Sequence, residues 1–263
     1  MEVGAVHVRN LKNPRQDYPK TLLIALIIIV TVFSLGSFAV ALVLPAKEIS
    51  LTAGLLQTFD KMLTFYHLHG LLPVMGFLIS FGAIGGVMAW ISGPSKGLLA
   101  TAKHGELPPF LSRTNQQGIQ THILCLQGFF VTLLTSLYLI MDNVSTAFFL
   151  LSAMTVALYL LMYILVFLAG LRLRYLKPDV YRAYRIPYGN VGMWVTALCG
   201  LSAVSFAFIL AFFPPVELHV TNPKLYVTVV SGGVIIFSLI PLIMQQLKKP
   251  QWQIQSQQQD HFD

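Results

Sequence analysis

The chain has 263 residues, of which 56% are hydrophobic and only 10% are charged. Because soluble globular domains carry about 25% charged residues, this composition excludes a water-soluble domain and indicates a polytopic membrane protein. The net charge of +7 is compatible with nucleic acid as a partner, but its distribution favours basic loops at the cytoplasmic surface, and we expect no nucleic-acid binding.

Six apolar segments are long enough to cross a bilayer, which takes about 20 helical residues. None of them contains Asp, Glu, Lys or Arg, so all 17 basic and all 10 acidic residues lie between or beyond them. A charge near the bilayer centre costs about 2.5–3.5 kcal/mol on the most lenient scale. We therefore predict an all-α membrane protein with six transmembrane helices over residues 1–247, followed by a Gln-rich cytoplasmic tail at 248–263. The predicted spans are Thr21–Ala46, Leu71–Gly93, Thr121–Met141, Thr146–Leu171, Asn190–Pro215 and Leu225–Leu247.

The segments between the spans also carry signals. The first 20 residues have no h-region typical of a signal peptide and resemble the end of one helix and its link to the next. Ser50–Tyr66 has apolar residues at helical spacing, which predicts an amphipathic helix on the bundle or in the interface. Gly93-Pro94 predicts that the second span bends or pauses there.

The orientation follows from the basic residues in each connecting segment. The N-terminal segment, the second and fourth loops and the tail together hold 14 Lys and Arg, whereas the first, third and fifth loops hold 3. By the positive-inside rule, both termini face the cytoplasm. We expect a multi-pass membrane protein.

Polar aromatic residues within the spans are the candidates for a binding site. Trp90 lies one turn before Gly93-Pro94, and it is either an interfacial belt residue or part of a substrate path. Tyr159 and Tyr163 are four residues apart, so their hydroxyls line one helix face. They either meet a substrate or bond to core backbone. Gly82 and Gly86 form a small-xxx-small face that permits close helix approach.

Motifs of soluble enzymes are absent from the sequence, which has no phosphate-binding glycine loop, nucleophile elbow or metal-ligand spacing. We therefore predict no enzymatic activity, cofactor or metal. Cys125 and Cys199 lie in separate apolar runs and are interpreted as small core residues. The pair His67 and His69 is a weak metal signal.

Three stretches carry a resemblance to a known family: EVGAVHVRNLKNPRQDYPK, WISGPSKGLLATAKHGELPPFLSRTN and the tyrosine pair in TVALYLLMYILVF. They resemble parts of the amino-acid/polyamine/organocation (APC) permeases, and the resemblance covers nearly the whole chain, with the bacterial glutamate/GABA antiporters most similar. It implies a fold with two inverted five-helix repeats and a place in the bacterial inner membrane. It also implies alternating-access transport of a glutamate-like or GABA-like zwitterion.

The resemblance also implies roles for individual residues. Glu2 matches a glutamate that follows the break in the family's sixth helix, and backbone near Gly4 would take a substrate charge. Trp90 matches an aromatic gate of the eighth helix, and Tyr159 and Tyr163 match a substrate-facing pair of the tenth. Where the antiporters have an acidic residue four positions before the tryptophan, this chain has Gly86, which departs from the pattern for glutamate.

In the family's order, the chain begins with the stub of the broken sixth helix, and its six spans are helices seven to twelve. The resemblance thus implies the C-terminal half of a permease. Two functions follow: an amino-acid antiporter, or a non-transporting membrane fragment that is inert or pairs with a separately encoded N-terminal half. A six-helix channel would need a charge ring or a carbonyl filter, and the sequence shows neither.

The predicted orientation can be checked by cysteine labelling in intact cells. In a C125S/C199S background, Val180→Cys is expected to resist a membrane-impermeant maleimide, because the basic fourth loop faces the cytoplasm. His219→Cys, in the fifth loop, is the control and should be labelled. The reverse pattern would contradict the orientation.

Overall fold

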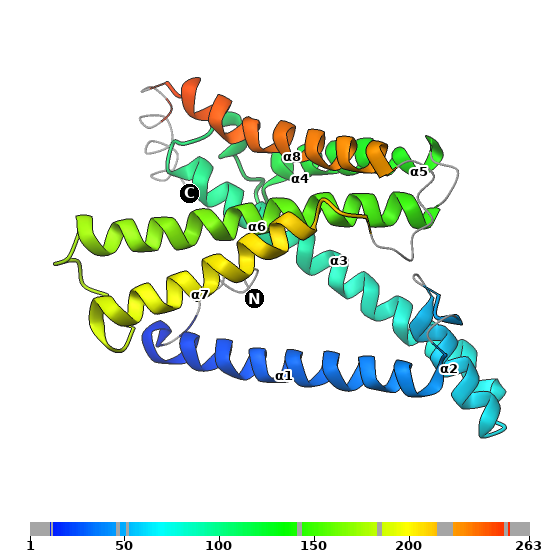
Figure 1. Ribbon diagram of the computed structural model, residues 1–263. Coiled ribbons are helices and arrows are strands. Elements are labelled where there is room, and N and C mark those ends of the chain that lie inside the picture. Colours follow the sequence, from blue (N-terminus) through cyan, green and yellow to red (C-terminus); the bar gives the residue numbers. More distant parts are fainter. Residues whose placement is uncertain are drawn as a thin grey trace. The chain divides into compact units, whose positions relative to one another are not determined.

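The computed structural model describes residues 11, 13–45, 48–50, 53–140, 144–182, 186–214, 223–249 and 252. These residues are helical or irregular, and none of them lies in a strand (Figure 1). Six of the helical segments in the described residues are long and apolar enough to cross a membrane, which confirms the predicted fold class. The elements are α1 (Pro14–Val43), α2 (Gly54–Phe65), η3 (His69–Leu71), α3 (Leu72–Lys103), η4 (Pro109–Leu111), α4 (Thr121–Thr135), α5 (Leu137–Ile140), α6 (Val144–Leu176), α7 (Gly189–Leu210) and α8 (Pro223–Gln246).

The chain divides into two compact units. The first comprises Met1–Gln127 and Trp252–Asp263, and the second comprises Gly128–Gln251. We refer to them as the α1–α3 unit and the α6–α8 unit, after the long helices that each contains, and describe each one by itself.

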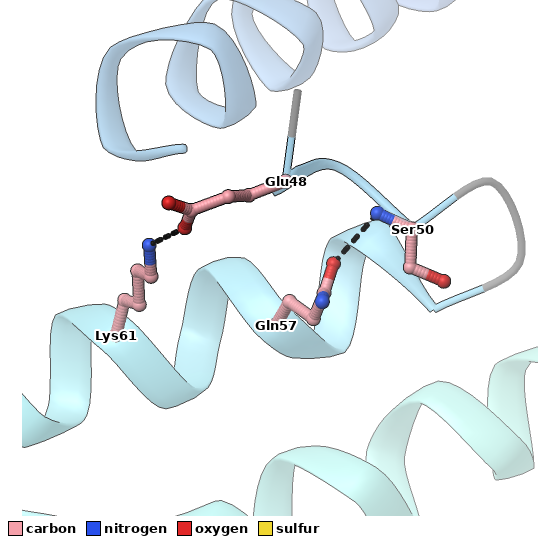
Figure 2. Close-up of polar contacts among 4 residues, drawn as sticks. All are labelled: Glu48, Ser50, Gln57 and Lys61. Carbon is pink, nitrogen blue, oxygen red and sulfur yellow. Dashed lines mark hydrogen bonds and ion pairs between the residues drawn. The ribbon is translucent and has the colours of Figure 1, made fainter. Parts of the chain in front are cut away.

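In the α1–α3 unit, the predicted amphipathic helix is present as α2. Two polar contacts hold it to the segment that precedes it, as Figure 2 shows: Lys61 Nζ lies 2.7 Å from Glu48 Oε2, and the Ser50 backbone N–H donates to Gln57 Oε1 at 2.8 Å. Because the ion pair is exposed, it contributes about 0–1 kcal/mol. The structure thus fixes α2 between α1 and α3, both of which it contacts.

The sequence predicted that the second span bends or pauses at Gly93-Pro94, and the structure shows no pause there. Helix α3 is continuous through Pro94 and ends at Lys103. Neighbouring polar and backbone groups let membrane helices tolerate proline. Here Ser95 Oγ donates to the Ser92 carbonyl at 3.0 Å, directly beside the proline.

The third predicted span, by contrast, is interrupted where the sequence indicated one helix. Helix α4 ends at Thr135, and α5 begins at Leu137. Thr135 Oγ1 donates to the carbonyls of Val131 and Thr132, and Ser136 Oγ donates to that of Leu133 at 2.6 Å. Side chains that bond to backbone carbonyls in this way compete with the helical ladder, and two such residues lie directly at the break. Met141, the predicted end of this span, lies outside the described residues.

The core of the α6–α8 unit lies between α6 and α8. Leu150, Met154 and Ala157 recur along one side of α6 and pack against Tyr226, Val230 and Val234 of α8. Helix α7 lies along α6, as Figure 1 shows. Glycines allow the close approach: a Cβ on Gly200 would overlap the Phe167 ring, and one on Gly233 would overlap the Met154 sulfur. Small residues at membrane helix contacts serve this purpose.

A further closely packed glycine lies at the start of α7. A Cβ at Gly192 would overlap the backbone carbonyl of Pro187, which cannot move aside as a flexible side chain can. We expect Gly192→Ala to destabilise the detergent-purified chain by about 1–3 kcal/mol, the usual cost of overpacking, as measured by thermal unfolding.

Gly85→Ala provides the matched control, since nothing lies within 4 Å of the added Cβ and alanine favours a helix over glycine by roughly 0.5–1 kcal/mol. It should unfold at the wild-type temperature or above. Equal unfolding temperatures for the two variants would contradict the packing described for the start of α7.

Candidate functional site

The two candidate tyrosines lie side by side on α6. The ring centroids of Tyr159 and Tyr163 are 6.4 Å apart, with the ring planes inclined by 42°, and both side chains are half-buried. Tyr159 follows Leu150 by nine residues, about two and a half turns, so it lies on the face of α6 opposite the core shared with α8. Two hydroxyls therefore share a face of a charge-free span that the α6–α8 core does not occupy.

Trp90 lies on a part of α3 where every side chain is exposed. The exposed stretch runs from Ser80 to Ile91, and Trp90 itself is 51% exposed. Helical spacing sorts the side chains there into a small face and a bulky face. No described residue lies within 4 Å of a Cβ placed on Gly82, Gly85 or Gly86, so the small face makes no close helix contact with the described residues of its own unit. The small face carries Gly82, Gly85, Gly86 and Ala89, and the bulky face carries Phe77, Phe81, Ile84, Met88 and Ile91.

Just beyond Trp90, Ser95 of α3 makes a buried polar contact that the sequence did not predict. Gln120 Nε2 donates to Ser95 Oγ at 2.8 Å, and both side chains are buried. Ala102, Leu111 and Ile123 form a small apolar cluster beside them. A buried polar group without a partner costs about 1–3 kcal/mol, so this pair ties the segment before α4 to the end of α3. The only sequence signal was a glutamine directly before an apolar span.

Helix α1 presents a second accessible surface. A shallow groove of about 450 Å³ runs along it, lined by Phe33, Ser34, Ser37, Phe38 and Ala41. All five residues belong to one helix, so the groove is open on its far side. Like the small face of α3, it is an apolar surface with a few small or hydroxyl-bearing residues that the described chain does not cover.

The remaining candidates have a simpler outcome. Glu2 and Gly4 lie outside the described residues. Tyr159 and Tyr163 lie side by side in the α6–α8 unit. Trp90 belongs to the α1–α3 unit.

Metal binding gains no support among the described residues. They contain no group of three His, Cys, Asp or Glu side chains placed to hold a metal ion. In the His67–His69 pair, His67 adopts a left-handed backbone conformation with φ of 56°. His69 Nδ1 lies 3.4 Å from Thr64 Oγ1, a hydrogen-bond contact within the same turn.

The apolar spans carry hydroxyl and indole groups but no charged side chains. Such helices are suited to binding a small molecule rather than to acid–base chemistry. A family profile described as amino acid permease matches residues 1–238. The chain belongs to the amino acid permease family, within the APC superfamily.

Curated relatives of this permease chain are transporters. An uncharacterized transporter of Legionella pneumophila is 37% identical over 241 residues, which is 92% of this chain and 52% of the relative. A glutamate/gamma-aminobutyrate antiporter of Lactococcus lactis is 32% identical over 250 residues, which is 94% of this chain and 50% of the relative. A probable agmatine/putrescine antiporter of the same species is 24% identical over 70% of the chain and 40% of its own length. The chain thus spans about half the length of the relatives that it matches. No solved structure matches it.

Proposed function

We propose that this permease chain takes part in amino-acid exchange across the bacterial inner membrane, with a glutamate-like or GABA-like zwitterion as substrate and with both termini in the cytoplasm. The family membership carries this proposal. The two Lactococcus lactis relatives named as glutamate/gamma-aminobutyrate antiporters, at 32% and 31% identity, support the substrate class.

The paired tyrosines are proposed to bind the substrate. Their hydroxyls lie on a half-buried face of α6 in a span without charged side chains, where a hydrogen bond to a carboxylate or ammonium group is stronger than in water. Trp90 acts as a hydrophobic gate, and Glu2 and the backbone at Gly4 receive the substrate's charged ends. Half-helix ends and unwound backbone satisfy a zwitterion without buried charged side chains.

Gly86 bears on which zwitterion is carried. It lies one turn before Trp90 on the exposed stretch of α3, where the resemblance expects an acidic residue. Without that carboxyl group, this position supplies no protonation step at acidic pH. We therefore propose that transport lacks the acid dependence which an acidic residue at this position would bring.

We further propose that a second set of membrane helices, encoded separately, completes the transporter. The chain matches 50–53% of the length of three transporter relatives, and within the α1–α3 unit the small face of α3 and the groove on α1 are uncovered. Glycine faces of this kind favour close packing of another helix. The competing function is a non-transporting membrane fragment, which the half-length match also supports.

Transport assays separate these functions. In liposomes loaded with GABA, we expect uptake of labelled glutamate only when the chain is reconstituted with a co-expressed N-terminal half, for which the 37% identical Legionella pneumophila relative is the first source. The reason is that half of the binding site would come from the second set of helices.

Two results would contradict this expectation. Uptake by the chain alone would show that no second set of helices is required. No exchange in either preparation would favour the non-transporting fragment.

In the active preparation, Tyr163→Phe and Tyr159→Phe are each expected to raise KM for glutamate, because each removes a hydrogen bond worth about 0.5–1.5 kcal/mol, a change of roughly two- to tenfold. Tyr138→Phe on α5 is the control and should leave KM unchanged. Unaltered KM in both α6 variants would mean that these hydroxyls serve only the fold.

A further inference from the structure

The end of α6 and the start of α7 form a charged turn that the transport proposal does not use. We call the described residues 172–182 and 186–194 the basic turn. They hold four basic residues and one acidic residue, Asp179. We propose that the basic turn binds the headgroup phosphates of anionic phospholipids. This proposal is independent of whether the chain transports an amino acid.

The depth of the basic turn matches the headgroup layer. Leu171 is the last residue of the charge-free part of α6, and the helix continues from Arg172 to Leu176. Five further residues lengthen a helix by about 7–8 Å, close to the thickness of one headgroup layer, roughly 5–8 Å. The charges at the end of α6 thus lie where lipid phosphates lie.

Side-chain contacts hold the two helix ends together at this level. Trp194 Nε1 donates to the Tyr175 hydroxyl at 2.6 Å, and Arg174 Nε donates to Asn190 Oδ1 at 3.0 Å. Both pairs join α6 to α7. Trp and Tyr side chains are enriched at the membrane–water interface because an apolar ring and a polar group are both satisfied there.

One arginine, Arg182, forms its hydrogen bonds within the turn itself. Arg182 donates from Nη1 to the carbonyls of Pro178 and Val180, and from Nη2 to those of Leu173 and Lys177, at 2.9–3.3 Å. These four bonds occupy all four terminal N–H groups of the guanidinium and satisfy carbonyls at the C-terminus of α6. Arg182 therefore folds the turn back onto the helix and is a positioning residue, not a phosphate ligand.

Two basic side chains of the basic turn remain exposed to the surroundings of the protein. Arg172 and Lys177 are exposed, and neither side chain has an ion pair or hydrogen bond with another described residue. Exposed aromatic side chains accompany them: Tyr181 is 66% exposed and Tyr188 is 90% exposed. Tyr188 holds a left-handed conformation with φ of 62°, uncommon for an aromatic residue. Exposed cations at headgroup depth, in a turn that also exposes aromatic rings, favour an anionic lipid surface.

The proposal is tested by counting lipids bound to the detergent-purified full chain with native mass spectrometry. The probes are phosphatidylglycerol and phosphatidylcholine with the same acyl chains. We expect tighter binding of phosphatidylglycerol, and a loss of its affinity in R172Q/K177Q of about fivefold per charge, or roughly 25-fold, with phosphatidylcholine binding unchanged.

R113Q/K224Q is the matched control, because it also removes one exposed arginine and one exposed lysine, from other parts of the chain. It should retain wild-type affinity for phosphatidylglycerol. An equal loss in both double variants, or no loss in R172Q/K177Q, would overturn the proposal. So would full displacement of the lipid by an equal concentration of soluble glycerol 3-phosphate, since the site would then recognise a free phosphate. Both double variants change exposed side chains, so their thermal unfolding should match wild type.

Discussion

The exclusion of charge from hydrocarbon governs this protein. Every span lacks Asp, Glu, Lys and Arg, and the ionic side chains collect at helix ends and loops, where they remain hydrated. The same constraint applies to binding: within the spans, hydroxyls, an indole and backbone groups must supply the polar contacts that buried charges supply in soluble proteins. The small face of α3 and the tyrosine pair of α6 place small and hydroxyl-bearing side chains within such charge-free spans.

Packing within the described chain is uneven. In the α6–α8 unit, glycines at positions 200 and 233 lie directly against Phe167 and Met154, and six buried side chains form one core. In the α1–α3 unit, glycines at positions 82, 85 and 86 face open space, although the composition of that helix is equally apolar. The difference separates glycines that lie against another helix of their unit from glycines that meet no described neighbour within theirs.

Sequence reasoning identified the helices better than their limits. Charge-free length predicted all six spans, because hydropathy reports which residues tolerate lipid. It did not predict that α3 continues through Pro94 to Lys103, or that α4 ends at Thr135. Hydropathy does not distinguish the two outcomes, because proline, serine and threonine occur both inside membrane helices and at their ends. The tyrosine spacing was readable because it is local to one helix.

The sequence alone determined the membrane class, the number of spans, the spacing of Tyr159 and Tyr163 and the resemblance to the permeases, since these depend on composition and on neighbours along the chain. Tertiary structure decided which glycines are packed and that Gln120 bonds to Ser95 across 25 positions of sequence. It also decided that Arg182 donates its hydrogen bonds to backbone carbonyls, whereas Arg172 and Lys177 are exposed. The physical reason is that a side chain's partner depends on which distant segments the fold brings next to it, and the spacing of residues along the chain does not determine this.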